Sequence, residues 1–443
     1  MARALRAVLT EAADAAAAAS GFVRRRSKLT GSGFVRTLVF GWLANPAATL
    51  EELSQTSALL GVPVSPQALD QRFTPTAAAC LEAVLGVAVG SVIAADPVAV
   101  PLLRRFRGVY VQDSTTIGLP GALAEHFPGC GNASTPAAQS AALKLQVRLE
   151  LTTGALDGPV PHAGRTHDRA APAVGAPLPP GALRLADLGY FSLDSLGALA
   201  ADGVFWLARL QVQTAVFDAA GERRDVPAWL AQQGAPVLDL PVTLGVRHRL
   251  AARLLAVRVP AAVAAERRRR LRAEARRRGQ RVSRDRLAWA DWTLVITNVP
   301  SERLTLDEAV VLYRARWQIE LLFKLWKSQG RLDDWRSAKP WRILCEVYAK
   351  LVAMVLQHWL LLTGCWAAPD RSLTKASQTV RTHAPRLALA ATSAARLRAA
   401  LTTLARCLAA GARINRRAAT PHTYQLLLAF PDQPALDADR RAA

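Results

Sequence analysis

The segment YRARWQIELLFKLWK, residues 313–327, places one carboxylate, two cations and a phenol at fixed intervals. These side chains belong to Tyr313, Arg316, Glu320 and Lys327. On a single helix, steps of three, four and seven residues keep all four on or near one face. An acid between two fixed cations suits a divalent metal ion and a phosphodiester, because the acid can bind the metal while the cations hold phosphate oxygens. An amphipathic helix with a solvated charged edge is the plainer alternative.

Two aspartates stand where predicted strands end. Val109–Val111 is a β-branched and aromatic run that predicts a strand ending at Asp113, and the motif VQDSTTI adds hydroxyl groups beside this acid. Asp187, in LADLGYF, follows a second predicted strand at 182–186, and Gly189 permits a tight turn next to it. Either aspartate alone could be an ordinary turn residue.

Taken together, the three acids suggest a metal site. Asp113, Asp187 and Glu320 are separated by 74 residues (187 − 113) and 133 residues (320 − 187). Carboxylates from two strand ends and a helix can hold two divalent ions roughly 3.5–4 Å apart; one ion activates a water or a 3′-hydroxyl and the other stabilises the leaving oxygen. Mg²⁺ suits such a site, with Mn²⁺ as an alternative, because it uses few protein carboxylates and keeps waters and phosphate oxygens in its shell. We therefore predict that these acids are catalytic metal ligands.

The composition predicts the kind of partner. Lysine and arginine number 56 against 34 aspartate and glutamate, a net charge of +22. This excess predicts an anionic polymer as partner and salt-dependent binding, although an arginine-rich genome explains part of it. The five cysteines form no CxxC pair, which argues against a zinc site and favours free thiols in a reducing cytoplasm. The longest apolar stretches, Ala83–Ala95 and Leu351–Leu356, fall short of the roughly 20 residues that span a bilayer, so we expect a soluble protein without a membrane partner.

Across about residues 105–350, these motifs resemble the DDE transposases of the insertion-sequence-four family. VQDST resembles the first acid motif of that family, LADLGYF the second, and YRARWQIELLFKLWKS the third, which carries the Y-R-E-K signature. LKLQVRLELTTGAL, GRTHD at 164–168 and LVITNVP at 294–300 resemble the strands and turns between them. The resemblance implies an α/β fold with a ribonuclease-H-like mixed sheet flanked by helices. It also implies a mostly β insertion in that sheet and helical N- and C-terminal regions.

The resemblance assigns a role to each motif residue. The metal ligands would be Asp113, Asp187 and Glu320. The residues that contact phosphates near the transposon end would be Tyr313, Arg316 and Lys327. Lesser phosphate candidates are Lys144, Arg209 and Lys324. The partner would be double-stranded DNA, both transposon ends and target, bound by a homodimer.

The tryptophans are weaker candidates. Some members of the family stack a flipped base on an aromatic ring during hairpin formation, and Trp292 or Trp289 could serve because stacking tolerates any base. Core packing is the favoured prediction for both of these residues. It is also the prediction for Trp317 and Trp326.

The chain divides into five predicted segments. These are a helical DNA-binding region at 1–100, a catalytic core at 101–214 and 291–365, an insertion at 215–290 and a helical C-terminal region at 366–443, with a disordered tip after Asp432. In the first segment, the basic stretch Gly21–Gly33 predicts a loop. Thr49–Phe73 predicts two helices, the second beginning near Ser65 with Pro66 at its first position. That spacing is typical of a helix-turn-helix, and an ordinary helical hairpin fits equally well.

Elsewhere the pattern predicts further strands and helices. The predicted strands lie at 143–151, 204–210, 237–244, 254–259 and 292–297. An arginine-rich run from Arg267 to Arg278 predicts a solvated helix, with DNA binding as the less favoured role. Leu306–Gln329 predicts one long helix or two.

We therefore predict an active transposase that cuts and joins DNA in the bacterial cytoplasm, associated with the nucleoid. A catalytically silent DNA-binding protein derived from a transposase is the alternative, and the intact acid triad argues against it. A nuclease or repair enzyme on the same core fits the cations around Glu320 less well. A net charge of +22 disfavours a glycosidase, the other common use of paired carboxylates.

Overall fold

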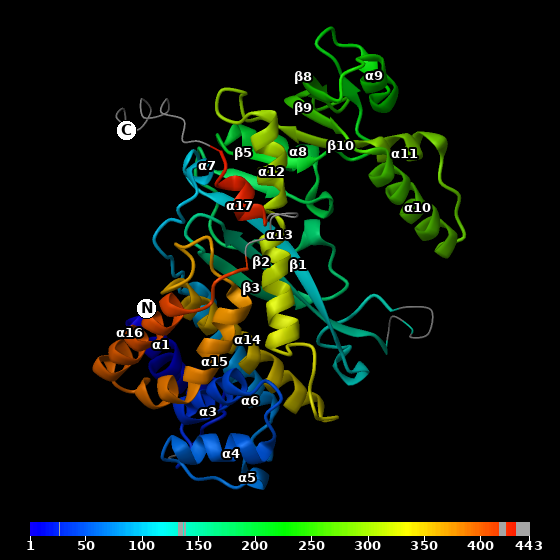
Figure 1. Cartoon of the computed structure of the whole chain (residues 1–443). Helices are drawn as coiled ribbons and strands as arrows, with labels where there is room; N and C mark the ends of the chain where they lie inside the picture. The colour runs from blue at the N-terminus through cyan, green and yellow to red at the C-terminus, as the bar shows by residue number, and fades with distance from the viewer. Residues whose placement is uncertain (26, 132–135, 137–138, 416–421, 431–443) are drawn as a thin grey trace. The chain divides into compact units, whose positions relative to one another are not determined.

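The computed structural model describes residues 1–25, 27–131, 136, 139–415 and 422–430 (Figure 1). The chain forms two compact units, each built from three separate segments. Unit 1 comprises Met1–Ala99, Gln112–Gly175 and Gln318–Pro421, and unit 2 comprises Val100–Val111, Ala176–Trp317 and His422–Ala443. The boundaries of the five predicted segments stay a prediction, and the tip predicted after Asp432 lies outside the described residues.

Helices fill the first hundred residues of unit 1, as predicted. They are α1 (Ala2–Ala7), α2 (Ala13–Ala19), α3 (Gly31–Ala44), α4 (Leu50–Leu59), α5 (Pro66–Asp70) and α6 (Pro75–Gly90), with a π-helical turn at Val8–Ala12. Ser65 caps α5 by accepting a hydrogen bond from the amide of Ala68, and Pro66 takes the first position, which confirms the predicted start. The predicted loop Gly21–Gly33 is too long, because Thr30 accepts from the amide of Gly33 and begins α3 at Gly31.

The core of unit 1 is the buried helix α14 (Pro340–Leu362), against which α3 and α6 pack. The chain is again helical beyond residue 366, as predicted: α15 (Leu373–Ala390), α16 (Ala394–Ala410) and, in unit 2, α17 (Thr423–Leu427). By length and composition α14 could cross a membrane, but its apolar window is wholly buried, as in the core helix of a soluble protein. This helix was not predicted from the sequence because Glu346 and Lys350 interrupt its apolar run. Inside the protein they pair at 2.7 Å.

A buried histidine on α14 should make stability depend on pH. Nε2 of His358 lies 2.7 Å from the carbonyl oxygen of Gly154, and burial lowers the pKa of His358 from its ordinary value of 6.5 to about 4. Between these two values the unfolded chain binds a proton that the folded chain does not, so stability falls as pH falls from about 6.5 to about 4. A difference of this size corresponds to about 3 kcal/mol in the free energy of unfolding.

We expect His358→Gln to remove most of that pH-dependent loss, because a glutamine amide can donate to the same carbonyl without titrating. As the pH is lowered from 7 to 4, the urea-unfolding midpoint of wild type should fall more than that of the variant. Parallel curves for the two proteins would show that His358 does not titrate in this way.

Ten strands form one mixed sheet. They are β1 (Val109–Leu119), β2 (Ala141–Glu150), β3 (Leu156–Ala163), β4 (Leu183–Ala186), β5 (Phe205–Arg209), β6 (Val216–Phe217), β7 (Arg223–Arg224), β8 (Val237–Leu244), β9 (Leu250–Arg258) and β10 (Trp292–Thr297). Their order is β3-β2-β1-β4-β5-β10-β9-β8-β6-β7. The pairs β1–β4 and β4–β5 are parallel, whereas β10 pairs antiparallel with both β5 and β9. This mixed sheet with helical terminal regions is the predicted fold class.

The predicted strands are present, and the strand predicted to end at Asp113 is longer. It continues to Leu119 as β1, because the β-branched residues Thr115, Thr116 and Ile117 keep the backbone extended. The edge strand β3 was not predicted, because it contains Pro159 and Pro161. Proline cannot donate to a strand ladder and is tolerated mainly at a sheet edge.

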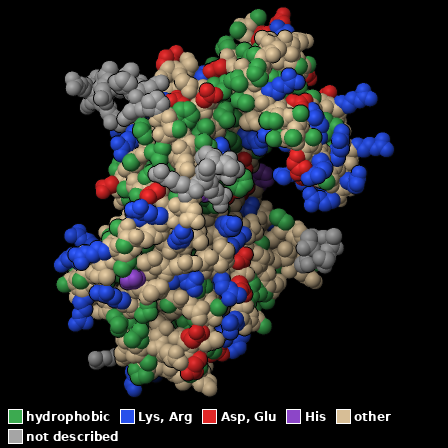
Figure 2. All heavy atoms as spheres, in the orientation of Figure 1, with side chains coloured by type: hydrophobic (Ala, Val, Ile, Leu, Met, Phe, Trp, Pro, Cys, Tyr) green, Lys and Arg blue, Asp and Glu red, His purple; other side chains and the backbone are tan. Residues whose placement is uncertain are grey.

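Unit 2 also contains the remaining helices. They are α7 (Pro101–Arg104), α8 (Leu193–Ala201), α9 (Val226–Gln232), α10 (Ala261–Arg277), α11 (Arg284–Ala288) and α12 (Leu306–Arg314), while α13 (Trp317–Lys324) begins at its boundary. The predicted insertion at 215–290 holds four strands together with three helices, so its helical share is larger than the resemblance implied. The predicted arginine-rich helix is α10, and Figure 2 shows basic side chains gathered over it.

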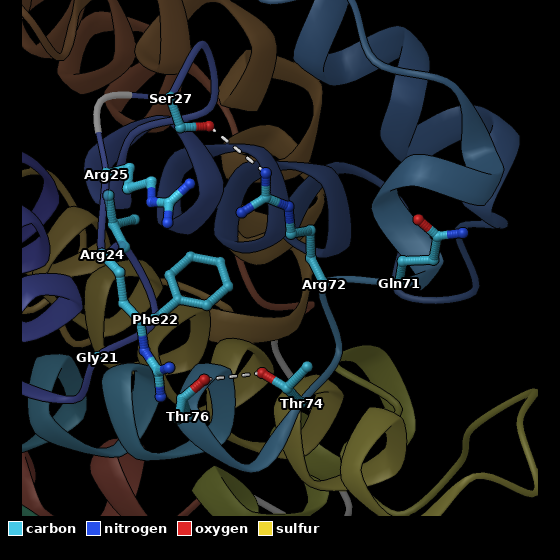
Figure 3. A pocket seen from close by; sticks show the side chains of 10 residues that line it. Gly21, Phe22, Arg24, Arg25, Ser27, Gln71, Arg72, Thr74 and Thr76 are labelled. Atoms are coloured by element: carbon cyan, nitrogen blue, oxygen red, sulfur yellow. Dashed lines mark hydrogen bonds between the residues drawn. The ribbon is translucent and has the colours of Figure 1, made fainter.

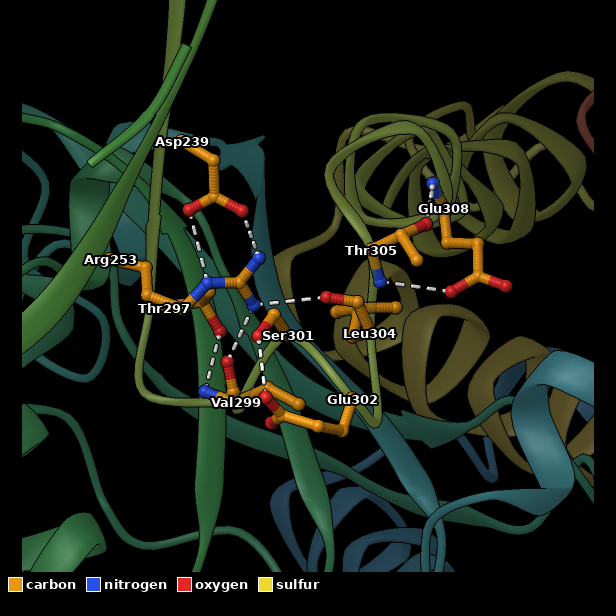
Figure 4. Close-up of polar contacts among 9 residues, drawn as sticks. All are labelled: Asp239, Arg253, Thr297, Val299, Ser301, Glu302, Leu304, Thr305 and Glu308. Atoms are coloured by element: carbon orange, nitrogen blue, oxygen red, sulfur yellow. Dashed lines mark hydrogen bonds and ion pairs between the residues drawn. The ribbon is translucent and has the colours of Figure 1, made fainter. Parts of the chain in front are cut away.

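A polar network fixes the loop that leads from β10 into α12 (Figure 4). Arg253 on β9 donates to the carbonyl oxygens of Val299 at 2.7 Å and Leu304 at 2.9 Å, and it also binds Asp239. Thr305 then caps α12 in a reciprocal capping box with Glu308. The loop therefore holds the start of α12 in a defined orientation within unit 2.

Candidate active site

Asp113 lies inside β1, in the part of that strand that belongs to unit 1. Its Oδ1 accepts a hydrogen bond of 2.8 Å from the amide of Ser114, and its side chain is half-buried. The Ser114 hydroxyl points to another acid, donating to Oδ1 of Asp168 at 2.8 Å. The hydroxyl-rich motif after Asp113 thus connects the strand to a second carboxylate.

Asp168 is the centre of a polar network that was not predicted from the sequence. Besides Ser114, its Oδ1 accepts from Nε2 of Gln146 at 3.2 Å and from Nζ of Lys144 at 3.3 Å, both on β2. Lys144 also donates to the carbonyl oxygen of Thr166 at 2.7 Å. This phosphate candidate is therefore engaged within the protein. Asp168 is the aspartate of the motif GRTHD. This motif was predicted only to resemble a turn of the family, and no function was predicted for its aspartate.

Glu320 lies on α13, also in unit 1, and is half-buried. Ile319, Leu322 and Phe323 of the same helix are buried and hold it in place. Seven residues later, Lys327 donates from Nζ to the carbonyl oxygen of Thr116 on β1 at 3.0 Å. Lys327 thus ties the segment after Glu320 to the strand that carries Asp113.

The Y-R-E-K motif does not lie on one continuous α-helix; of the one or two helices predicted over Leu306–Gln329, the structure has two α-helices. The first helix, α12, ends at Arg314, α13 begins at Trp317, and Leu325–Gln329 form a π-helical turn. Such a wider turn changes the angular step between residues, so spacing alone cannot place the four side chains on one face. The predicted core position of Trp326 is confirmed at 1% exposure, whereas Trp317 is 57% exposed and is not a core residue.

Asp187 lies in unit 2, directly after β4, at the start of the turn Leu188–Tyr190. Nε of Arg316 lies 3.8 Å from its Oδ1, and the Arg316 side chain is only 11% exposed. The phenol of Tyr313 donates to the carbonyl oxygen of Ala186 at 3.2 Å. Burial raises the pKa of Tyr313 to about 12, so this hydroxyl keeps its proton at neutral pH. Two motif residues therefore surround the turn that carries Asp187.

The other predicted residues divide between surface and core. Arg209 on β5 and Lys324 on α13 are exposed and therefore accessible to a phosphate. Trp292 is 6% exposed and belongs to the hydrophobic core of unit 2, with Trp289 packed against it, which confirms the favoured prediction of core packing for these two. Both line a cavity of about 340 Å³, together with Arg209.

The predicted residues are divided between the two units. Asp113, Glu320 and Lys327 belong to unit 1, and Asp187, Tyr313 and Arg316 belong to unit 2. Among the residues that the structure describes, no three His, Cys, Asp or Glu side chains form a group that could hold a metal ion. Convergence of the three acids on a metal pair stays a prediction.

Comparison with known proteins identifies the family. Residues 104–356, more than half of the chain, match the family model described as a transposase DDE domain. The chain belongs to the DDE transposases. The matched segment contains all three motif acids, so the family is shown over the region from which the resemblance was drawn.

Some named transposases resemble this DDE transposase over most of its length, and others resemble it over a shorter segment. It is 26% identical over 358 residues to the transposase for insertion sequence element IS231F of Bacillus thuringiensis subsp. israelensis, which covers 76% of this chain and 74% of the relative. It is 24% identical over 369 residues to the transposase for IS1151 of Clostridium perfringens, covering 78% and 76%. The putative transposase InsL of Escherichia coli (strain K12) is 37% identical over 105 residues, 24% of this chain and 28% of the relative. These names fit the predicted insertion-sequence-four family.

Proposed function

We propose that this DDE transposase cleaves DNA at the ends of an insertion sequence and joins the freed 3′ ends to target DNA, with Asp113, Asp187 and Glu320 as its active-site carboxylates. The observation that carries the proposal is the parallel register of β1 and β4. Val111 pairs with Leu185 at the end of that register, and each aspartate follows this last pair by two residues. Two acids at the same interval beyond the last pair of adjacent parallel strands support their assignment to one metal site.

The third acid is supported by the contacts of unit 1. Lys327 bonds the backbone of β1 three residues beyond Asp113, and the α13 residues beside Glu320 are buried. The strand that carries one acid and the segment that carries the other are therefore fastened together. A metal ion bound to the carboxylate of Asp113 would then have the carboxylate of Glu320 on a neighbouring element that is held in place.

The donor set fits Mg²⁺ or Mn²⁺, because all three proposed ligands are carboxylates and each keeps part of its surface exposed. Two divalent ions bound by Asp113, Asp187 and Glu320 would supply a nucleophile of lowered pKa and stabilise the leaving 3′ oxygen. DDE transposases in general use divalent metal ions, and the number and identity of the ions here belong to the proposal.

The neighbouring residues hold these carboxylates in position and balance their charge. Tyr313 fixes the end of β4 through the carbonyl oxygen of Ala186, so it restrains the turn that presents Asp187. Arg316 places a largely buried cation beside Asp187. When DNA is bound, the planar guanidinium can hold a phosphate in two hydrogen bonds while it stays next to the acid.

The proposed partner is double-stranded DNA, bound by two copies of the chain in the bacterial cytoplasm at the nucleoid. The net charge of +22 supports an anionic partner, and α10 shows how part of that charge is displayed. Arg267 turns inward and donates to the carbonyl oxygen of Trp292 at 2.9 Å, whereas Arg272, Arg276 and Arg277 are exposed. These exposed charges suit contact with phosphates, which position DNA without reading its sequence.

The test of the proposed function is cleavage of a plasmid that carries the DNA flanking this gene, in which we expect inverted repeats. With Mg²⁺ present, purified protein should release the fragment between the repeats, and a plasmid with scrambled repeats should stay uncut. Binding to the repeats without any cleavage, in Mg²⁺ or Mn²⁺, would instead support the catalytically silent DNA-binding protein.

Arg316→Ala should weaken DNA binding on all sequences and slow cleavage. The salt dependence of binding should flatten by about one phosphate contact, because a single cation is removed from the backbone interface. Arg316→Lys should restore only part of the affinity, since lysine lacks the planar fork. The measurement is affinity against salt concentration on end-containing and random duplexes. Arg314→Ala, an exposed arginine two residues away, is the matched control. A change in sequence preference with an unchanged salt slope would mean that Arg316 reads bases.

A further inference from the structure

We infer that a cavity in the N-terminal helices of unit 1, lined by Arg24, Arg25 and Arg72, binds phosphates of the DNA backbone. The inference rests on the proposed function, because it takes DNA as the partner, and it adds a binding site remote in sequence from the DDE motifs. Figure 3 shows this cavity with its lining side chains.

The walls come from two segments that the sequence singled out separately. One wall is the loop that follows α2, with Arg24, Arg25 and Ser27, and the other is the chain that leaves α5, with Gln71 and Arg72. The cavity has a volume of about 540 Å³. The basic loop and the predicted pair of helices at Thr49–Phe73 therefore meet at one site.

The lining is that of an anion site. Its polar members are three arginines, Gln71 and the hydroxyls of Ser27, Thr74 and Thr76, and none of the described residues that line it is a carboxylate. The hydrophobic floor is Phe22, which is 8% exposed and packs on Phe34 with ring centroids 4.6 Å apart. Arginine with hydroxyl donors is a combination that recurs in contacts to phosphate oxygens.

The arginines have charge available for a ligand. Arg72 donates to the Ser27 hydroxyl at a long 3.5 Å, and within the described part of the chain neither Arg24 nor Arg25 has an ion-pair partner. The nearby acids are engaged elsewhere. Asp70 pairs with Lys339 at 2.5 Å and with Arg342 at 3.2 Å, and Asp14 accepts from the amide of Ser32 at 2.7 Å.

The shape favours a polymer over a free anion. A volume of about 540 Å³ is far larger than one phosphate group, and Arg24, Arg25 and Gln71 are exposed at its rim. A nucleic acid backbone offers several phosphates in a row, so it can meet exposed arginines and the half-buried Arg72 together. Such contacts would set the position of the duplex while leaving sequence discrimination to other residues.

The test uses the full-length protein and a double substitution, Arg24→Gln with Arg72→Gln. Fluorescence anisotropy on a short duplex of unrelated sequence gives affinity as a function of salt. We expect the slope of log affinity against log salt to fall by about two, one for each phosphate that the variant no longer neutralises. The matched control removes the same charge from α16 by Arg396→Gln with Arg398→Gln, two exposed arginines of the same unit, and should leave the slope near that of wild type.

Two further arms keep the result interpretable. The variant Arg24→Lys with Arg72→Lys keeps the charge and should retain most of the slope. If Arg72→Gln lowers the unfolding midpoint, the pair Arg24→Gln and Arg25→Gln, both at exposed positions, is used in its place.

Equal slopes for the cavity pair and the α16 control would overturn the inference. Replacing chloride by inorganic phosphate at constant ionic strength tests the free anion, and displacement of DNA by phosphate from wild type but not from the cavity variant would assign the site to phosphate itself.

Failure of this inference can be told apart from failure of the proposed function. A wrong cavity assignment leaves wild-type cleavage intact and the slopes equal. A wrong catalytic assignment appears as cleavage that survives removal of a motif acid, whatever the slopes are.

Discussion

Replacing Asp187 with alanine is expected to abolish strand cleavage while leaving DNA binding nearly unchanged. Because the change removes a proposed direct metal ligand, the rate should fall by more than the roughly 100-fold upper range seen when outer-shell partners of a metal are changed. Cleavage rate and duplex affinity are measured on the same preparation. Asp113→Ala and Glu320→Ala should behave in the same way, because all three acids are proposed to share the ions.

Asp202→Ala supplies the control for this experiment, since Asp202 is an exposed aspartate of the same unit and the variant should cleave at the wild-type rate. A cysteine at position 187 gives a sharper test. A thiolate prefers softer ions than Mg²⁺, so Asp187→Cys should be silent in Mg²⁺ and regain some cleavage in Mn²⁺. Full activity of any single-acid alanine variant would show that the carboxylate in question is not a ligand.

The second large effect is expected at the buried ion pair between Arg105 and Glu308. The Arg105 guanidinium holds both carboxylate oxygens of Glu308 at 2.8 and 2.9 Å, and each side chain is only 5% exposed. Glu308→Ala leaves the arginine buried without its carboxylate, which costs about 3–5 kcal/mol. It also removes the capping box of α12, worth about 1 kcal/mol more. Urea-unfolding midpoints measure the destabilisation.

An apolar replacement of the whole pair separates charge from packing. The double variant Arg105→Met with Glu308→Leu removes both charges and keeps most of the volume, so it should be much closer to wild type than Glu308→Ala. A single variant that costs less than about 1 kcal/mol would place this pair in the range of surface salt bridges. The loop before α12 would then be held chiefly by Arg253.

The fold could be predicted wherever one physical signal dominates a segment. Alternation of apolar and polar residues identified β2, and runs of strand character identified β8 and β10 at their observed bounds. The two-residue strands β6 and β7 are too short to show any period. β3 was not predicted because it contains Pro159 and Pro161. These prolines are tolerated because β3 lies at the edge of the sheet.

The residue types of the candidate site could be predicted from the sequence, but the local geometry of the site could not. Spacing implied one helical face for the Y-R-E-K motif, but a break after Arg314 and a π-helical turn at Leu325–Gln329 change the phase twice. Trp317 was predicted to lie in the core, but it is exposed because it follows the break after Arg314. The role of Asp168 depends on hydrogen bonds to β1 and β2, which no local pattern encodes.

The position of α14 in the chain has a consequence for biosynthesis. Helices α3 and α6 pack on α14, yet α14 begins 250 residues (340 − 90) after α6 ends. At about 5–20 residues per second, the ribosome needs roughly 12–50 s to supply that partner. During this interval the first helices can contact one another, but the apolar faces of α3 and α6 that pack on α14 have no partner. A gene copy interrupted before Pro340 would therefore yield aggregation-prone chains, not a small end-binding fragment able to compete with the intact protein.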